Sequence, residues 1–438
     1  MSYQCQNCGY KSLKWLGRCP ECGAWHSFTE EREEKASKRK EKKPLKILKL
    51  SEISCSSKPR ISTGLSEFDL VLGGGIVPAS MILIGGDPGI GKSTLLTQMA
   101  GDLIRRGRKV LYFSAEESPE QVKLRTQRLS VPEDFYFLSE TDLNLLFEAI
   151  EEISPEVVIV DSIQTVYLPE LASSPGSVSQ VKECANQLLR LAKEKDITIF
   201  LVGHITKEGV IAGPKILEHL VDVVLYLEGE KETGFRILRA MKNRFGAVNE
   251  IGVFVMTEKG LESHTSYEEL FLTGEGVPTC ILEGTRPLLV EIQALTTKSF
   301  LSVPRRQSVG YDPIRLSLLC AILEKKLGIG LSDRDVYVKV AGGLKIRDPG
   351  ADFAVALSLL SSLLEKKLPE KTLYIGEIGL SGELRPVREL SARVKEAEKK
   401  GFLRALVPDY GKGEIKVSGL ELIPLKDLIS AFKLLFGL

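Results

Sequence analysis

A glycine-rich segment has the most specific spacing in the chain: Gly86-Asp87-Pro88-Gly89-Ile90-Gly91-Lys92-Ser93-Thr94. It fits the pattern G-x-x-x-x-G-K-[ST], in which backbone amides surround phosphate oxygens, the lysine neutralises the β- and γ-phosphates and the hydroxyl binds Mg²⁺. The apolar run 81–86 precedes the segment, and a helical pattern at 93–107 follows it. A helix N-terminus would therefore face the phosphates. The sequence predicts a site for ATP and Mg²⁺, because an ordinary strand–helix turn would need neither Lys92 nor Ser93.

Acidic residues at the ends of two other apolar runs are candidates for the remaining catalytic groups. Asp161 ends the run 157–161, where a carboxylate that binds Mg²⁺ belongs. An ordinary aspartate at a strand end is the alternative. Glu116 and Glu117 follow the run 110–115, and either could orient the attacking water. The other glutamate would then cap the next helix, for which Pro119 suits the first turn.

Four cysteines lie within the first 22 residues, as the pairs Cys5-x2-Cys8 and Cys19-x2-Cys22, ten residues apart. Each pair forms a tight turn that presents two thiolates, and two such turns complete a tetrahedral Zn²⁺ site. Two disulfides are the alternative, which a reducing cytosol disfavours. A closed set of four thiolates is structural and not catalytic. The partner of this block is nucleic acid or protein, and the sequence does not decide between them.

The elements that must position these residues are short apolar runs alternating with helical patterns. This alternation indicates an α/β fold with a mostly parallel sheet covered by helices on both faces. We expect a zinc module at 1–28, a charged linker at 29–59, an ATPase domain at 60–275 and an α+β domain at 276–438. The strand-like runs are 81–86, 110–115, 157–161, 198–204 and 223–229, with tail strands near 288–297, 335–341 and 372–378. The helical patterns are 93–107 and 180–195, with tail helices near 313–327, 351–365 and 388–400.

Composition excludes several classes of protein. The 438 residues include 59 Lys and Arg against 58 Asp and Glu, so nucleic acid would have to meet local basic patches. No apolar run is long enough to span a bilayer, and the start of the chain lacks an apolar signal core. Four of the eight cysteines lie within the first 22 residues, and the other four are scattered along the chain. An extracellular disulfide framework is therefore not expected. We expect a cytoplasmic protein without a membrane partner.

Several motifs resemble a known family. The segments 63–69, 72–75, GDPGIGKST and YFSAEES look like the RecA-type ATPase core. Together with the cysteine block, the segment KNRFG (242–246) and a Lon-protease-like tail, they are similar to the bacterial RadA (Sms) family of DNA repair proteins. The resemblance implies a DNA-dependent ATPase, a hexameric ring that drives branch migration in homologous recombination like a helicase. It also implies single-stranded and branched DNA and a recombinase as partners, Glu116 as the catalytic base, and a γ-phosphate sensor around His204.

Lys242 and Arg244 lie two residues apart in a strand-like run, so they project from one face. Two cations aimed outward beside an ATPase sheet suit a finger inserted into the neighbouring subunit's site, the part played by a similar pair in DnaB-type helicases. A phosphate clamp on DNA and an exposed strand end are the alternatives.

Basic residues in two regions are candidates for binding the DNA backbone. The first region is a loop that follows a core strand, and the second is the surface of the tail domain. The candidates are Lys207, Lys215, Lys298, Arg305, Arg306, Lys345 and Arg347.

The tail resembles Lon, but the residues of the protease's Ser/Lys pair do not match. Gly350 stands at the serine position, between Pro349 and Ala351, and Ser391 stands at the lysine position. A serine–lysine pair needs both groups, because the amine deprotonates the hydroxyl. We therefore expect a scaffold that helps to close the ring and touches DNA. The competing hypotheses are an ATP-dependent peptidase and a KaiC-like signalling ATPase.

Overall fold

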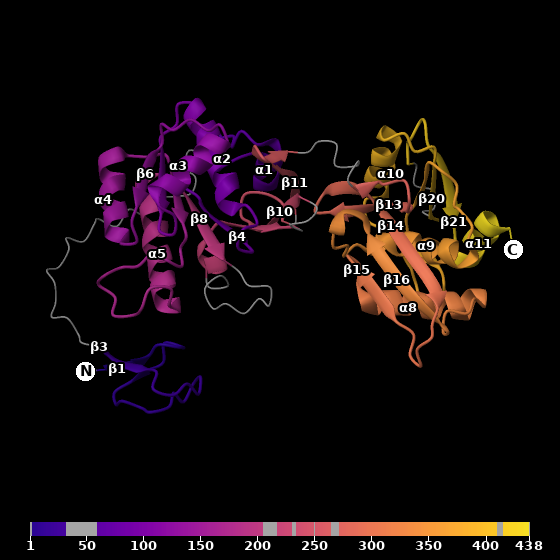
Figure 1. Cartoon of the computed structure of the whole chain (residues 1–438), viewed down its shortest axis with the longest axis horizontal. Helices are drawn as coiled ribbons and strands as arrows, with labels where there is room; N and C mark the ends of the chain where they lie inside the picture. The colour runs from indigo at the N-terminus through magenta and orange to yellow at the C-terminus, as the bar shows by residue number, and fades with distance from the viewer. Residues whose placement is uncertain are drawn as a thin grey trace, which may run out of the picture. The chain divides into compact units, whose positions relative to one another are not determined.

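The computed structural model describes residues 2–31, 59–204, 217–229, 234–248, 250–263, 271–409 and 415–437. The chain divides into two compact units (Figure 1). The first comprises Met1–Leu227, Met241–Gly246 and Glu258–Gly260, and the second comprises Glu228–Ala240, Ala247–Thr257 and Leu261–Leu438. Within these described ranges, no helix is both long and apolar enough to cross a membrane.

The amino-terminal module is a small antiparallel sheet with the order β2-β1-β3. Cys5, Cys19 and Phe28 form its buried core, which is too small to stabilise a domain without a further constraint. Its strands are β1 (Ser2–Cys5), β2 (Lys11–Ser12) and β3 (Phe28–Glu31).

Six parallel strands form the centre of a large sheet. They are β4 (Met81–Gly86), β5 (Val110–Ser114), β6 (Tyr136–Ser139), β7 (Val157–Asp161), β8 (Thr198–His204) and β9 (Val223–Glu228). The order is β9-β4-β8-β7-β5-β6, and β10 (Phe235–Asn243), β11 (Ile251–Thr257) and β12 (Gly260–Ser263) follow in turn beyond β9. All residues of β4, β5 and β7 are buried, as expected of continuous apolar strands with both faces covered. This confirms the predicted α/β class.

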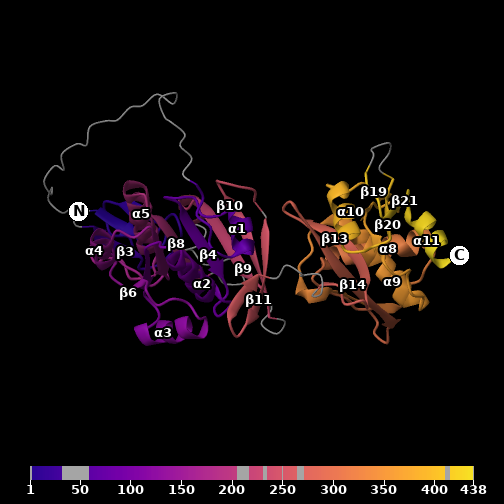
Figure 2. The same cartoon turned by 90° about the horizontal axis from the view of Figure 1, so that it is seen from above.

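Helices cover both faces of the parallel strands (Figures 1 and 2). Leu146 and Leu188, from α4 and α5, share one core with Val158 and Leu201. On the opposite face Phe68 of α1 meets the ring of Phe200 edge-on, with 6.2 Å between ring centroids. The helices of this region are α1 (Ser66–Leu72), α2 (Lys92–Arg105), α3 (Pro119–Arg128), α4 (Leu143–Ile153) and α5 (Val178–Lys195).

The carboxy-terminal region has its own core, in which α9 packs on a four-stranded sheet of order β13-β14-β16-β15 (Figure 2). Two smaller sheets have the orders β17-β20-β21 and β18-β19. The strands are β13 (Val277–Glu283), β14 (Arg286–Lys298), β15 (Arg306–Val309), β16 (Arg334–Val340), β17 (Thr372–Tyr374), β18 (Glu377–Ile378), β19 (Leu384–Arg385), β20 (Arg404–Pro408) and β21 (Glu421–Leu425). The helices are α8 (Pro313–Leu327), η2 (Ala341–Gly343), η3 (Pro349–Ala351), α9 (Asp352–Leu364), α10 (Leu390–Lys399) and α11 (Leu428–Phe436).

Candidate functional site

The glycine-rich segment forms the turn between β4 and α2, at the carboxyl end of β4. Gly86 has φ 152°, and a Cβ atom there would lie 2.4 Å from the carbonyl oxygen of Leu227, so the turn requires glycine at this position. Gly91, with φ 117°, is the N-cap of α2, and Lys92 is its first residue. The amides of the first helical turn therefore face the loop, which is the arrangement that binds phosphate.

Lys92 is only 4% exposed, and its ammonium group lies inside the loop. Its Nζ donates hydrogen bonds to the carbonyl oxygens of Gly86, at 2.8 Å, and Asp87, at 3.1 Å. Burial lowers the pKa of Lys92, while the negative charges of Asp161 and Glu116 raise it. A phosphate group in the loop would supply the negative charge that this buried cation favours.

Asp161 ends β7 and lies next to the start of α2. Its carboxylate accepts a hydrogen bond from Tyr112 Oη at 2.7 Å, and the side chain of Ser93 is also hydrogen-bonded to it. Burial raises the pKa of Asp161, whereas these hydrogen bonds lower it. The Ser93 hydroxyl and the Asp161 carboxylate thus offer two neighbouring oxygen ligands, which fits the way proteins bind Mg²⁺ beside phosphates. The bound ion would neutralise the buried carboxylate.

The two glutamates after β5 have different surroundings. Glu117 forms an ion pair with Arg125 of α3, with 2.5 Å between Arg125 Nη2 and Glu117 Oε2 and 2.8 Å between Nη1 and Oε1. Glu116 is exposed, accepts a hydrogen bond from the Ser162 hydroxyl and acts electrostatically on Lys92. Of the two carboxylates, Glu116 is therefore the one that is exposed to solvent and whose charge acts on Lys92.

One of the two glutamates was expected to cap the following helix, but neither of them does. Ser118 is the N-cap of α3, and its side chain accepts a hydrogen bond from the amide of Gln121. The Gln121 side chain accepts in return from the backbone amide of Ser118, which completes a capping box. Pro119 occupies the first turn, as expected.

Sequence reasoning did not identify Tyr112 and Arg125. Arg125 links three parts of the site, because it also donates to Thr97 Oγ1 at 3.1 Å and lies over the Tyr112 ring, 6.0 Å from its centroid. The alternation of side chains along β5 places Tyr112 on the same face as Ser114, which pairs with Asp161. This alternation is visible in the sequence, so Tyr112 could have been identified from it. Arg125 could not have been identified, because its contact depends on where α3 begins.

The outward direction expected of both cations requires correction for Lys242, which turns back onto its own chain, whereas Arg244 pairs with Asp222 and its side chain stays 53% exposed. Lys242 Nζ donates to the carbonyl oxygens of Glu218, at 2.6 Å, and Val221, at 2.8 Å. Arg244 Nη1 lies 3.0 Å from Asp222 Oδ1. Both cations contact the same short segment, which agrees with a common face. Lys242 turns inward because the carbonyl oxygens of Glu218 and Val221 lie within hydrogen-bonding distance of its ammonium group.

These two cations lie at the amino ends of the parallel strands, whereas the phosphate loop lies at their carboxyl ends. The amide of Asp222 donates to the carbonyl of Met81 at 2.9 Å, so the segment sits at the amino end of β4, whereas the loop follows its carboxyl end. β4 has six residues, which corresponds to roughly 16 Å at about 3.3 Å per residue. Lys242 and Arg244 therefore cannot contact a nucleotide in the loop of their own subunit.

The four cysteines come together as expected, with all their sulfur atoms within 4.8 Å of one another. The sulfur atoms of Cys5 and Cys22 are 3.7 Å apart, and those of Cys8 and Cys19 are 3.5 Å apart. Tetrahedral Zn²⁺ with bonds of about 2.3 Å needs sulfur separations of about 3.8 Å, so the residues fit the ion. His26 does not belong to this cluster; its ring lies 6.1 Å from that of Trp15.

Removal of the metal is expected to unfold residues 2–31 while leaving the ATPase core folded. The metal contributes about 10–16 kcal/mol in modules of this kind, far more than the small core can supply. Both tryptophans of the chain, Trp15 and Trp25, lie in this module, so tryptophan emission reports its folding alone. Because both tryptophans are already exposed, the anisotropy of that emission is the better readout: a strong chelator should lower it as the module unfolds, and added Zn²⁺ but not Mg²⁺ should restore it. Unchanged anisotropy in the demetallated protein would contradict the prediction.

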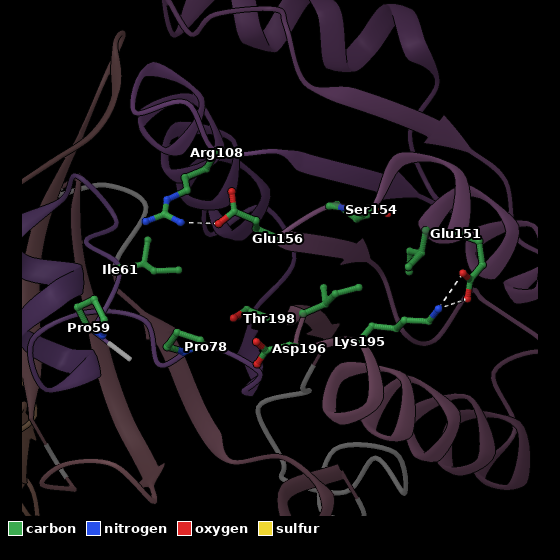
Figure 3. Close-up of a pocket in the computed structure, with 13 residues that line it drawn as sticks. Pro59, Ile61, Pro78, Arg108, Glu151, Ser154, Glu156, Lys195, Asp196 and Thr198 are labelled. Carbon is green, nitrogen blue, oxygen red and sulfur yellow. Dashed lines mark hydrogen bonds and ion pairs between the residues drawn. The ribbon is translucent and has the colours of Figure 1, made fainter. Parts of the chain in front are cut away.

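A cavity of about 450 Å³ lies at the amino end of β7 and β8, and it is not the nucleotide site (Figure 3). Its charged side chains form ion pairs with each other, Arg108 with Glu156 and Lys195 with Glu151. It contains no glycine loop, and its cations are already neutralised, so it offers little for a triphosphate.

An ion pair occupies the position in the tail where the protease pattern places its serine. Gly350 is buried, and a Cβ atom there would lie 2.9 Å from Arg393 Nη1 and 3.1 Å from Asp348 Oδ1. Arg393 is 1% exposed, and its Nη1 lies 2.5 Å from Asp348 Oδ2 and 2.6 Å from the carbonyl oxygen of Cys280. Asp348 also accepts from the amide of Leu282 at 2.6 Å. The ion pair therefore ties α10 to β13 and to the turn before α9.

The nearby serines are engaged in local structure. Ser358 and Ser361 donate to the carbonyl oxygens of Val355, at 2.8 Å, and Lys366, at 2.7 Å. Ser362 accepts from the amide of Thr296 at 2.9 Å. These contacts fix the packing of α9 and leave no serine–lysine hydrogen bond in this region among the contacts described.

Loss of the Arg393 side chain is expected to destabilise the tail by about 3–5 kcal/mol, because Asp348 would keep a buried charge without its partner. The variant Arg393→Met can be compared with Arg385→Met, which removes an ion pair that is half exposed and is expected to cost under about 1 kcal/mol. Hydrogen exchange of the β13 amides measures the effect, and equal protection in both variants would contradict it.

The basic candidates for binding DNA have different positions. Lys207 and Lys215 lie outside the described residues. Lys298 and Arg305 are exposed near the start of β15, and Lys345 and Arg347 are exposed near its end, where the amide of Ile346 donates to Gly310. The expectation for Arg306 requires correction: one of its guanidinium nitrogens is buried and the group lies beside the buried thiol of Cys320. It alternates with outward residues along β15, which explains its inward direction.

Three family models match parts of the chain. Residues 57–210 match an AAA domain, residues 3–30 a rubredoxin metal-binding domain, and residues 320–410 the subunit ChlI of Mg-chelatase. The first two coincide with the phosphate loop and with the four-cysteine cluster, which confirms the predicted ATPase core and zinc module.

Curated relatives match along almost the whole chain. The DNA repair protein RadA of Bacillus subtilis is 47% identical over 99% of this chain and 98% of its own. The DNA repair protein RadA of Listeria monocytogenes is 45% identical over 96% of each chain. Among solved structures, a KaiC-like protein from Pyrococcus horikoshii has a TM-score of 0.41 and 17% identity, covering 47% of this chain and 99% of its own, which is too low to support an inference.

Proposed function

The chain belongs to the RadA family of DNA repair proteins, and from that membership we propose that it couples ATP hydrolysis to movement along DNA during homologous recombination. It is a RecA-like ATPase with a zinc module. The finer activity proposed here is a DNA-dependent, helicase-like motor that promotes branch migration as a ring, with single-stranded and branched DNA as its partners and a recombinase as a further one.

The observation that carries the proposal is the cluster of charged groups around the phosphate loop. Lys92 would neutralise the β- and γ-phosphates, and Ser93 and Asp161 would hold Mg²⁺. Glu116 would orient the attacking water, because Arg125 holds the other glutamate. The positions of these side chains support the proposed roles: Lys92 and Ser93 begin α2, Asp161 ends β7, and Glu116 follows β5.

Lys242 and Arg244 support a ring in which hydrolysis depends on the neighbouring subunit. Since they lie at the opposite edge of the sheet from the loop, they can act on a nucleotide only in another subunit. A contact between two different edges of the same molecule is heterologous, and it closes into a ring when the rotation allows. On assembly the two cations would leave the segment 218–222 for the γ-phosphate of the neighbour. A hexamer is proposed by resemblance alone.

The buried ion pair of the tail argues against the peptidase hypothesis. Arg393 and Asp348 fill the space beside Gly350, where the nucleophile would have to lie. We propose instead that the tail serves as a scaffold and contributes cations to the DNA path through Lys298, Arg305, Lys345 and Arg347.

The expected result that tests the proposal is stimulation of ATP hydrolysis by single-stranded DNA, and its loss together with branch migration in Lys92→Ala. Removing this cation is expected to lower turnover by at least about 10²–10³-fold, because the transferred phosphate loses its charge partner. Lys109→Ala, an exposed lysine of the same unit, serves as the control. Branch migration retained by Lys92→Ala would refute the motor, and an ATPase rate that DNA leaves unchanged would favour a KaiC-like signalling ATPase. Cleavage of casein would support the hypothesis of an ATP-dependent peptidase instead.

A further inference from the structure

Both tryptophans of the chain lie exposed on the amino-terminal module. Trp25 is 67% exposed and Trp15 is 51% exposed. Large aromatic side chains are usually well covered in a monomer, because they carry much apolar area. Two exposed tryptophans on so small a module therefore indicate a surface that another molecule covers.

The Trp25 ring lies next to a guanidinium group and the Trp15 ring next to an imidazole ring, both from the amino-terminal module. Arg18 pairs with Trp25 in an isolated β-bridge, and its guanidinium lies over the Trp25 ring, 5.6 Å from the centroid. Arg18 Nε donates a hydrogen bond to the carbonyl oxygen of Gly23 at 3.2 Å. The His26 ring lies 6.1 Å from the Trp15 ring, and the His26 amide donates to Gly17 at 2.8 Å. We call this region, with Lys11 and Lys14, the tryptophan surface.

The charges of the tryptophan surface are positive and few. Lys11, Lys14 and Arg18 are exposed, whereas the acidic residues of the module are Glu21 and, at its carboxyl end, Glu30 and Glu31. Four thiolates around Zn²⁺ add a formal charge of −2, so the module as a whole has no excess of positive charge. Contacts to an anionic chain here would depend more on the aromatic rings than on long-range attraction.

We propose that the tryptophan surface binds single-stranded DNA, with bases stacked on Trp25 and Trp15 and the cations on the flanking phosphates. Stacking on an aromatic face requires an unpaired base, which a duplex does not present. Arg18 lies over the Trp25 ring and Lys14 precedes Trp15 in the chain, so each ring has a cation near it, which suits a chain that carries both bases and phosphates. This inference rests on the proposed function, because it assigns a further contact to the DNA substrate.

Titration of the full-length zinc-loaded protein with oligothymidylate is the decisive experiment, because tryptophan emission reports only this surface. We expect the oligonucleotide to quench the emission and an equal length of duplex to leave it unchanged. Trp25→Ala and Trp15→Ala should each weaken binding by about 5- to 100-fold, measured by anisotropy of a labelled strand. With three cations, the part of the salt dependence due to this surface should have a slope no steeper than about −2 on logarithmic axes.

Two control variants separate stacking from other uses of the surface. Trp25→Phe keeps an aromatic face and should keep the affinity. Leu13→Ala removes the neighbouring side chain, which is 86% exposed but not aromatic, and should also bind normally. A loss in Leu13→Ala as large as in Trp25→Ala would show that the strand is not bound by aromatic stacking, and it would overturn the proposal. Unchanged emission while the labelled strand binds would overturn it and leave the motor intact, whereas failure of any strand to bind would overturn both.

Discussion

Glu116→Gln is expected to lower kcat for ATP hydrolysis by about 10²–10⁴-fold while ATP still binds. Glutamine has nearly the same shape as glutamate and can still accept from Ser162, but it cannot take a proton from the attacking water. The phosphate loop and the Mg²⁺ ligands are untouched by this change. Steady-state hydrolysis gives kcat, and equilibrium binding of a fluorescent ATP analogue shows that the site remains intact.

Glu117→Gln is the matched control, since the two residues are adjacent and the substitution is the same. Its carboxylate is paired with Arg125, which is itself mostly buried. We expect lower thermal stability, because Arg125 loses its counter-charge, and a kcat that stays within a few-fold of the original protein. If Glu117→Gln lost turnover and Glu116→Gln kept it, the assignment of the base would have to be reversed.

Lys242→Ala is expected to lower turnover by about 10³-fold or more, as in other enzymes where a cation completes a phosphoryl-transfer site from a neighbouring subunit. The sharpest test mixes two variants that are inactive alone. A Lys242→Ala subunit has a complete phosphate loop, and a Lys92→Ala subunit has a complete Lys242. Mixed rings should therefore regain hydrolysis at those interfaces where the intact loop faces the intact Lys242.

Lys193→Ala is the control for this experiment. Lys193 contacts the carboxylate that Arg244 also contacts, next to the carbonyl groups bound by Lys242, with 3.2 Å between its Nζ and Asp222 Oδ2, but it has no assigned part in hydrolysis. Its loss should leave turnover nearly unchanged. An absence of recovery at every mixing ratio, in samples shown to form mixed assemblies, would place Lys242 on DNA instead.

The parts of the molecule that depend on short-range spacing could be predicted from the amino-acid sequence. The phosphate loop, the strand that ends at Asp161 and the paired cysteines are each defined within a few residues. Their geometry follows from local backbone rules, namely glycine turns, a helix start and buried parallel strands. These predictions therefore needed no knowledge of tertiary contacts.

Long-range contacts decided the rest, and spacing alone could not reveal them. The choice between Glu116 and Glu117 depends on Arg125, which reaches its partner only because Ser118 starts α3 where it does. The inward turn of Lys242 depends on carbonyl groups more than twenty residues away. The pair of Arg393 and Asp348 joins α10 to the turn before α9, two segments of the tail that no pattern relates.

The filled pocket around Gly350 also limits how the tail could change during evolution. If serine replaced Gly350 first, its Cβ atom would clash with Arg393. If Arg393 were lost first, the buried carboxylate of Asp348 would be left without its cationic partner. Each single step toward proteolysis therefore passes through an unstable intermediate, so at least three coordinated substitutions are needed. Selection that tests one mutation at a time would keep this domain locked in a non-proteolytic form.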